Sequence, residues 1–288
     1  MEVKENVPVG TKTTMRIGGA ARYFGEPKTR EDVEQAVAFA AEKNIPLIVL
    51  GNGANTIFAD GTIEALVIRI AAAATVIDGN IVTVEAGKNL AMLINELADK
   101  DLDLSTLTGI PGTVGGALFG NAGQGHGGIW IDTFVRSVTA YVDGSWKTLS
   151  REECEFRYRE SGFKDARGPV IIWSAVLEVP GKPAADVKAE VQRLLQKRIE
   201  TQPHLKTAGS CFKSLPDGTP AWKLVDAAGL RGTTVGGIQI AEKHANFLLN
   251  VGNATFDDAL NITALIKEKV PQIAGIEMRL YGNDGRLR

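Results

Sequence analysis

Residues 109–116 read Gly-Ile-Pro-Gly-Thr-Val-Gly-Gly, so half of this stretch is glycine. Glycine has no Cβ, and a backbone rich in it can adopt left-handed dihedrals and bring successive N–H groups close to a phosphate or a flat ring. A second tract, Gly120-Asn121-Ala122-Gly123, follows directly, with further glycines at positions 125, 127 and 128. A set of tight turns would explain one such tract. Two in succession favour a ligand-binding loop.

A third glycine loop lies upstream of these tracts. Residues 45–50 form a short apolar run that predicts a buried strand, and this run leads into Gly51-Asn52-Gly53-Ala54-Asn55. None of the loops is a P-loop, because no Gly-Lys-Ser/Thr follows, and residues 51–53 lack the third glycine of the dinucleotide fingerprint. The sequence therefore indicates nucleotide binding without a Rossmann domain.

Periodicity predicts the elements around the loops. Thr29 and Asn89 are residue types that accept hydrogen bonds from the free N–H groups of a helix start, and apolar residues recur at helical spacing after each of them. Period-two or continuous apolar runs predict strands, two of which, with a turn at Asp143-Gly144, form a hairpin. The expected strands are 66–70, 76–78, 81–86, 138–142, 146–149 and 170–179.

Pro180-Gly181-Lys182-Pro183 is the strongest linker signal in the chain. It divides the chain into domains of residues 1–180 and 184–288. An amphipathic helix is expected directly after it, with Val187, Val191, Leu194 and Leu195 on one face. Beyond that helix, strands alternate with helices, which is typical of a small α/β domain. The expected strands are 235–240, 247–251 and 276–281, and the expected helices are 222–228 and 256–269.

Composition excludes several classes of protein. The chain has 288 residues, of which 44% are hydrophobic, so it forms a packed core rather than a disordered or fibrous chain. Its 32 basic and 34 acidic residues give a net charge of −2, so we expect neither a nucleic-acid partner nor an acidic membrane surface. Residues 1–12 contain no apolar core of signal-peptide length, so we expect no secretion signal. The longest apolar run, residues 65–77, is too short and too interrupted to span a bilayer.

The cysteines and histidines give little support to metal or nucleophile chemistry. Cys154 and Cys211 cannot staple a chain of this length, which favours a reduced, cytoplasmic setting in which both are small buried residues. His126, His204 and His244 are far apart in sequence and have no accompanying acidic ligand pattern, so no metal site is expected. No Gly-x-Ser-x-Gly elbow is present either, which disfavours a serine hydrolase.

Two short constellations remain. Residues 156–164 bring cations, hydroxyls and rings together, and residues 208–213 place Ser210 after a glycine and close to Lys213. Taken alone, residues 156–164 are equally well explained as a surface turn with solvated charges. Residues 208–213, taken alone, are better explained as a simple turn. Their meaning depends on the rest of the chain.

Taken in order, these pieces resemble the UDP-N-acetylenolpyruvoylglucosamine reductases, the MurB flavoenzymes of peptidoglycan synthesis. The resemblance runs nearly end to end, and the short interval between Ser210 and Glu277 is that of the type II form, which lacks an inserted lid. The motifs that carry it are 14–19 (Thr-Met-Arg-Ile-Gly-Gly), 50–55, 109–116 with 121–123, Tyr158-Arg159 with Ser161 and Phe163, Gly209-Ser210 with Phe212-Lys213, and 229–250 with Glu242-Lys243-His244-Ala245-Asn246-Phe247.

The resemblance implies an α+β fold. A two-part FAD-binding unit of the vanillyl-alcohol-oxidase (PCMH) type would precede a small α/β substrate domain. It also implies small-molecule substrates, with NADPH as hydride donor and FAD bound without a covalent link. Hydride would pass to the methylene carbon of UDP-N-acetylglucosamine enolpyruvate, and a proton to the carbon beside its carboxylate.

Residue roles follow from the same resemblance. Arg159 would be the cation at the enolate, Ser210 the proton donor and Glu277 the carboxyl partner, with Arg159, Ser210 and Lys213 binding substrate. Residues 51–55 would cradle the FAD diphosphate and the later tracts would line the flavin. The implied cofactor residues are Gly51, Asn52, Gly53, Ala54, Asn55, Gly109, Ile110, Pro111, Gly112, Thr113, Gly115, Gly116, Asn121, Ala122 and Gly123.

Alternatives stay open at this point. Ser214 stands where the family usually has asparagine, and residues 123–128 read GQGHGG rather than the usual GAYG. Another flavin oxidoreductase of the same fold, acting on an alcohol or sugar, would share the glycine loops, and a flavin-binding module without turnover would share them too. Period-two alternation in 276–281 puts Glu277 and Arg279 on one face, so residues alone equally predict a surface ion pair between them.

Overall fold

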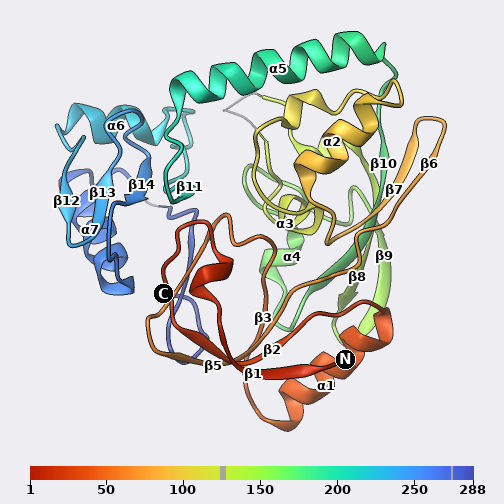
Figure 1. The fold of residues 1–288 in the computed structure, drawn as a ribbon, viewed down its shortest axis with the longest axis horizontal. Coiled ribbons are helices and arrows are strands. Elements are labelled where there is room, and N and C mark those ends of the chain that lie inside the picture. The colour runs from red at the N-terminus through yellow and green to blue at the C-terminus, as the bar shows by residue number, and fades with distance from the viewer. Residues whose placement is uncertain (124–127, 274) are drawn as a thin grey trace.

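The computed structural model describes residues 1–123, 128–273 and 275–288, whose strands form three sheets and one two-stranded pair. The first sheet has the order β1-β2-β5-β3, with β2, β5 and β3 parallel and β1 antiparallel at one edge (Figure 1). Helix α1 connects β2 to β3, as a parallel crossover requires. The bounds are β1 Val3–Pro8, β2 Ala20–Gly25, α1 Arg30–Glu42, β3 Leu47–Val49 and β5 Thr62–Ile68.

The second sheet is antiparallel, with the order β6-β7-β10-β8-β9. Helices α2 and α3 bury their apolar faces in the same core cluster as its strands, and α1 joins that cluster from the first sheet, so the two sheets form one unit. The bounds are β6 Thr75–Asp78, β7 Ile81–Glu85, α2 Leu90–Ala98, α3 Val114–Phe119, β8 Val135–Val142, β9 Ser145–Ser150, α4 Gly162–Asp165 and β10 Ile171–Glu178, with 3₁₀ turns at Gly10–Lys12, Ser105–Leu107 and Ile131–Phe134.

The third sheet, order β11-β14-β13-β12, is antiparallel and has its own core cluster. Helices α6 and α7 pack into that cluster. The bounds are α5 Ala184–Thr201, β11 Thr207–Ser210, α6 Ala221–Ala227, β12 Thr234–Val235, β13 Ile238–Ile240, β14 Phe247–Asn250 and α7 Phe256–Lys269.

Local sequence explains where the longer helices begin. Thr29 accepts a hydrogen bond from the Asp32 N–H while the Asp32 carboxylate accepts from the Thr29 N–H, and Thr255 and Asp258 repeat this reciprocal cap at α7. Asn89 caps α2 by accepting from the Met92 N–H. The helix starts predicted at Thr29 and Asn89 are therefore confirmed.

Helix α5 follows the linker but packs on the preceding unit. Val187 and Val191 are buried in the core cluster of the first two sheets. Figure 1 shows α5 running from the side of α2 across to β11. The boundary expected at residues 180–183 stays a prediction, and the packing of α5 favours a division near its C-terminal end.

The C-terminal strand returns to the N-terminal unit. β15 (Arg279–Tyr281) pairs in parallel with β4 (Thr56–Phe58), which directly follows the glycine loop at residues 51–55. The expected strand 276–281 is wrong in its first half, because the chain changes partners at Met278. Before this residue, the Glu277 N–H donates to the Cys211 carbonyl at 2.8 Å, and after it the chain pairs with β4.

A second expected strand is divided. Residues 235–240 form parts of two strands, β12 and β13, because Gly236-Gly237 makes a two-residue turn between Val235 and Ile238. Gly236 has φ +54°, a conformation that glycine adopts without the cost of a side chain. The Gly-Gly pair was the signal for this hairpin.

Both cysteines are buried thiols, as expected. Cys154 lies in the cluster of the first two sheets and Cys211 in that of the third. Burial raises the pKa of each thiol to about 12, so both carry their proton at neutral pH.

The packing of α5 can be tested within that helix. The expected apolar face is wrong in its second half: Val187 is fully buried, but Leu194 is half-buried and Leu195 is 42% exposed. We expect Val187→Ala to lower the free energy of unfolding by about 1–3 kcal/mol, because it leaves a cavity, and Leu195→Ala to change it by less than about 0.5 kcal/mol. Chemical denaturation measures both. Equal losses would contradict the packing of α5 on the first two sheets through Val187.

Candidate active site

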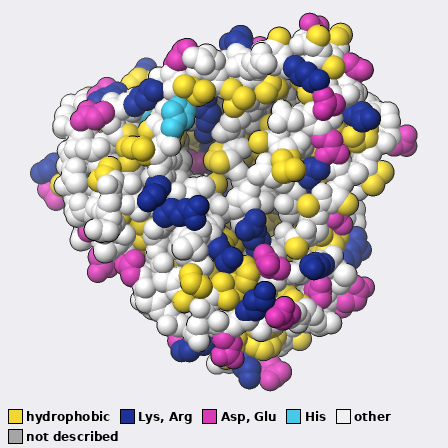
Figure 2. All heavy atoms as spheres, viewed as in Figure 1, with side chains coloured by type: hydrophobic (Ala, Val, Ile, Leu, Met, Phe, Trp, Pro, Cys, Tyr) yellow, Lys and Arg dark blue, Asp and Glu magenta, His cyan; other side chains and the backbone are white. Residues whose placement is uncertain are grey.

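A cavity of about 690 Å³ lies where the N-terminal unit meets the third sheet. Figure 2 shows this face of the molecule hollowed, with lysine and arginine side chains beside the hollow. Its wall includes three regions predicted from the sequence: residues 51–55, most of 109–116, and the positions of Arg159, Ser210 and Glu277. These segments are far apart along the chain, and the fold brings them together.

The glycine loop at residues 51–55 is shaped by its close approach to neighbouring parts of the chain. Gly53 has φ +63°, and a Cβ there would lie 2.6 Å from Thr13 Cα. A Cβ on Gly51 would lie 2.8 Å from Thr113 Oγ1, so this loop rests on the glycine tract at residues 109–116. Only glycine fits both constraints, which leaves the loop backbone open to the cavity.

The glycine tract at residues 109–116 lines the cavity from Ile110 onward. Gly112 has φ +129° with open space where a Cβ would stand, and Thr113 accepts a hydrogen bond from the Gly116 N–H at the start of α3. A Cβ on Gly115 would lie 2.8 Å from Ala86 Cβ, so this turn of α3 lies directly against the β-sheet unit. The wall here is bare backbone and small side chains, as a flat ring requires.

Two expected cofactor residues lie outside the cavity wall. Asn121 is 3% exposed, donates through Nδ2 to the Arg157 carbonyl at 3.0 Å and accepts through Oδ1 from the Asp132 N–H, so its contacts are structural. Gly109 lines a smaller neighbouring cavity, and the Arg198 side chain lies over its bare Cα. Ala122 and Gly123 do line the main cavity. Of the GQGHGG stretch, residues 124–127 lie outside the described residues.

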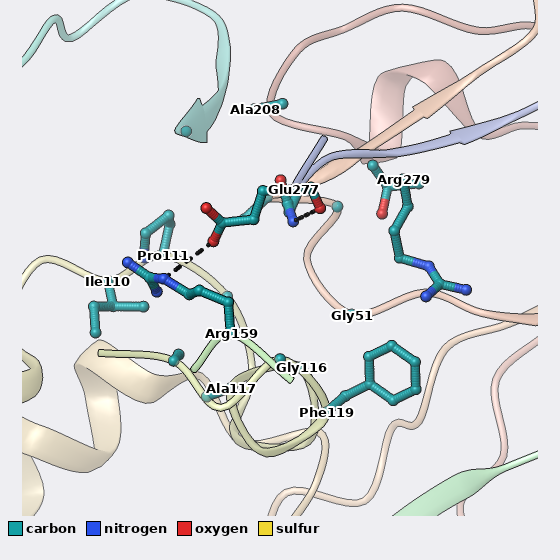
Figure 3. Close-up of a pocket in the computed structure, with 18 of the residues that line it drawn as sticks. Gly51, Ile110, Pro111, Gly116, Ala117, Phe119, Arg159, Ala208, Glu277 and Arg279 are labelled. Atoms are coloured by element: carbon teal, nitrogen blue, oxygen red, sulfur yellow. Dashed lines mark hydrogen bonds and ion pairs between the residues drawn. The ribbon is translucent and has the colours of Figure 1, made fainter. Parts of the chain in front are cut away.

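Arg159 stands at the tip of a tight hairpin. The N–H groups of Arg157 and Glu160 each donate to the carbonyl of the other, at 3.0 and 3.1 Å, which forces Arg159 to φ +57°. Its guanidinium carbon lies 5.3 Å from the centre of the Trp130 ring. Figure 3 shows the side chain pointing across the cavity toward Glu277. The Nε–Oε1 distance between them is 3.3 Å, an ion pair, and Arg159 Nε has no hydrogen-bond partner in the described part of the chain.

Glu277 is held by its backbone and is largely buried. Asn55 Nδ2 donates to the Glu277 carbonyl at 2.9 Å, and the Asn55 carbonyl accepts from the Arg279 N–H at 3.0 Å. Burial raises the pKa of the Glu277 carboxyl, and the positive charges of Arg159, Lys164 and Lys213 only partly oppose this. The group therefore keeps its proton to a higher pH than an ordinary glutamate.

The prediction of a surface ion pair between Glu277 and Arg279 is wrong. Arg279 donates from Nε and Nη2 to the Tyr281 hydroxyl, at 3.0 and 2.7 Å, and its guanidinium carbon lies 4.9 Å from the Phe119 ring centre. Both side chains line the cavity instead of meeting solvent.

Ser210 and Lys213 have different surroundings. Ser210 ends β11 and lines the cavity, and its hydroxyl has no hydrogen-bond partner among the described residues. Lys213 does not line the cavity, and its ammonium is paired with Glu160. The substrate-binding role expected of Lys213 stays a prediction.

Three cations of the cavity wall were missed by sequence reasoning. They are Lys164, Arg198 and Arg279. Lys164 belonged to the cationic constellation at 156–164, and Arg279 shares a strand face with Glu277, so both had a signal. Arg198 had none, because only the path of α5 brings its last turn over Gly109. Burial lowers the pKa of both Lys164 and Arg198.

Residues 1–123, 128–273 and 275–288 contain no group of three or more His, Cys, Asp or Glu side chains that could hold a metal ion. None of the helices in these residues is long and apolar enough to cross a membrane.

Comparison with known proteins supports the arrangement. Residues 21–150 match the model of an FAD binding domain, and residues 201–280 match the C-terminal domain of UDP-N-acetylenolpyruvoylglucosamine reductase. A UDP-N-acetylenolpyruvoylglucosamine reductase of Geobacter metallireducens is 37% identical over 98% of this chain and 95% of its own length. The chain belongs to this reductase family.

Other members of the family agree. The UDP-N-acetylenolpyruvoylglucosamine reductase of a Synechococcus strain is 34% identical over 98% of this chain and 92% of its own. The crystal structure of the UDP-N-acetylenolpyruvylglucosamine reductase (MurB) of Thermus caldophilus has a TM-score of 0.83 at 31% identity, covering 97% of this chain and 99% of that one. The predicted α+β fold, with a PCMH-type FAD-binding unit, is confirmed.

The cavity fits the cofactor of an FAD-binding domain. The glycine loops form a cradle whose shape a Cβ at Gly51, Gly53 or Gly115 would disrupt. Asn55 Oδ1 is a buried acceptor with no partner in the described residues. A volume of about 690 Å³ is within the range of cofactor sites.

The cradle can be tested with two glycines of similar backbone conformation. Gly53→Ala should lower FAD content about tenfold or more, because its Cβ would overlap Thr13 and displace the loop. Gly79 has φ +59° but open space around it, so Gly79→Ala carries only the left-handed strain and should retain FAD. Flavin absorbance per protein measures both. Full flavin content in Gly53→Ala would contradict a role for residues 51–55 in binding FAD.

Proposed function

We propose that this protein reduces UDP-N-acetylglucosamine enolpyruvate to UDP-N-acetylmuramate in peptidoglycan synthesis, using NADPH and non-covalently bound FAD. The observation that carries the proposal is the meeting of Arg159, Ser210 and Glu277 at one cavity whose opposite wall is the glycine cradle. Family membership supplies the substrate class. The two buried cysteines fit a cytoplasmic location, which is part of the proposal.

The cradle would hold FAD through residues 51–55 and 110–116, with Ala122 and Gly123 beside it. Bound FAD supplies the relay that takes hydride from NADPH and delivers it to the substrate. Arg279 and Lys164 add positive charge to the same cavity wall. Such charge suits a substrate with a diphosphate and a carboxylate.

Arg159 stabilises the negative charge that develops when hydride arrives at the methylene carbon. Electron density then moves toward the substrate carboxylate, and a fixed guanidinium in a largely enclosed site stabilises it strongly. The left-handed backbone and the Trp130 ring hold this cation in place before the reaction. Its Nε faces Glu277, which keeps the two groups together.

Ser210 donates the proton to the carbon beside the carboxylate. Its hydroxyl lines the cavity at the end of β11, next to Cys211, whose carbonyl holds the Glu277 N–H. Glu277 is the carboxyl partner, and its raised pKa suits a group that holds a proton in the working pH range.

One assay separates this function from its alternatives. Anaerobic NADPH should bleach the flavin absorbance, and the enolpyruvyl substrate should restore it. Acid precipitation should release the flavin, since its attachment is non-covalent. A protein whose colour is restored by another alcohol- or sugar-derived compound and not by this substrate would be a different oxidoreductase of the same fold. A yellow protein that never responds to NADPH would be a binding module.

Ser210→Ala tests the proton donor. The NADPH step should be unchanged, because no proton from Ser210 is needed there, while restoration of the flavin absorbance by substrate should slow by about 10²-fold or more. Anaerobic stopped-flow measures each step. Ser145→Ala, on an exposed position of β9, is the control. A near-normal substrate step in Ser210→Ala would leave Ser210 only a structural role.

Glu277→Gln tests the carboxyl. The change keeps size and hydrogen bonding but removes the acid, so the substrate step should slow by about 10²-fold while FAD content is retained. Because burial raises the pKa of Glu277, the protonated form persists to higher pH, and the wild-type rate should fall as pH rises through that raised pKa. The variant should lack this limb of the pH profile.

The matched control for Glu277→Gln is Glu64→Gln. Glu64 is half exposed and pairs with Arg22 on the surface. Its replacement should change neither the rate nor its pH dependence. Mild and similar effects in the two variants would reject a catalytic role for Glu277.

A further inference from the structure

The hairpin that carries Arg159 is anchored by the residue that follows it. Glu160 lies with Oε1 on the Lys213 ammonium and with Oε2 3.2 Å from the Lys164 ammonium. The three side chains are between 19% and 27% exposed, so water only partly screens these pairs. Burial alone would raise the pKa of Glu160, but the two ammonium groups outweigh it and the pKa is lowered.

Lys164 connects this carboxylate to Arg159 itself. Its ammonium also donates to the Arg159 carbonyl at 2.7 Å. The left-handed residue at the hairpin tip is thus held from both sides: by the backbone pair between Arg157 and Glu160, and by the ammonium that Glu160 holds. A change at Glu160 therefore reaches the Arg159 backbone through one side chain.

Lys213 connects the same carboxylate to the other half of the site. Its N–H donates to the Gly275 carbonyl at 3.1 Å, and two residues earlier the Cys211 carbonyl accepts from the Glu277 N–H at 2.8 Å. A second contact joins the same two segments, because the Tyr158 hydroxyl accepts a hydrogen bond from the Ser214 N–H at 3.2 Å. Glu160 therefore joins the loop of Arg159 to the segment that carries Ser210 and Glu277.

We propose that Glu160 is a positioning residue, which sets Arg159 against Ser210 and Glu277 by bridging Lys164 and Lys213. The proposal rests on the proposed function for its kinetic consequence. It also gives Lys213 a role as the far anchor of this bridge, in place of direct contact with substrate. Arg159 comes from the N-terminal unit and Ser210 from the third sheet, so their separation depends on contacts of this kind between the two bodies.

A two-residue mutant cycle tests the bridge in the FAD-loaded protein. Glu160→Gln and Lys213→Met should each slow the substrate step about tenfold at saturating substrate, as expected for a misplaced reacting group. KM for substrate and the NADPH step should stay within about twofold of wild type. The double variant should be no slower than the slower single variant, because both changes break one bridge.

The matched control is Glu155→Gln. Glu155 is an exposed acid at the base of the same hairpin, 3.9 Å from Arg157, and its replacement should leave the substrate step within about twofold of wild type. The same cycle measured on unfolding midpoints in denaturant should also be non-additive, and this readout needs no substrate.

Three results would overturn the proposal. Equal rates of the substrate step in Glu160→Gln and Glu155→Gln would remove Glu160 from the mechanism. A several-fold rise in KM for Lys213→Met that persists in the Glu160→Gln background would make Lys213 a substrate ligand. Additive unfolding effects would show that the pair does not act as a unit. If the enolpyruvyl substrate does not restore the flavin absorbance of the wild-type protein, the proposed function is rejected. The mutant cycle on unfolding midpoints would still test the bridge through Glu160 in that case.

Discussion

The parallel pairing of β15 with β4 is the contact on which the site depends. It joins residues 279–281 to residues 56–58, so the C-terminal strand lies beside the strand that follows the glycine loop at residues 51–55. Asn55 extends the pairing by one residue through its side chain and its carbonyl. The cofactor cradle and the carboxyl of Glu277 are thereby fixed relative to each other by backbone hydrogen bonds, which tolerate little displacement.

The site is correspondingly a junction of two cores. Arg159 and the glycine loops belong to the N-terminal unit, and Ser210 to the third sheet, which has a separate hydrophobic cluster. Met278 separates the contact of Glu277 with Cys211 from the pairing of β15 with β4. Its side chain is buried in the core cluster of the third sheet. A cavity built in this way can present backbone on one wall and charged side chains on the other, as ring binding and enolate stabilisation require.

Sequence reasoning succeeded where the determinants are local. Helix starts at Thr29 and Asn89 depend on residues three positions apart, and the glycine tracts announce backbone that must approach closely. It failed where the partner lies elsewhere in the chain. Nothing near Glu277 indicates that Arg159 will face it, and nothing near Gly109 indicates that Arg198 will cover it. The motif resemblance supplied that non-local information for Arg159, Ser210 and Glu277, and not for Lys164, Arg198 or Arg279.

The two buried thiols give each core its own reporter. Thiolate is the form that alkylating reagents attack, and with a pKa of about 12 neither Cys154 nor Cys211 presents it in the closed protein at neutral pH. Modification at either position therefore requires that core to open. Because the cysteines lie in different clusters, the ratio of their labelling rates measures whether the halves open together or one before the other.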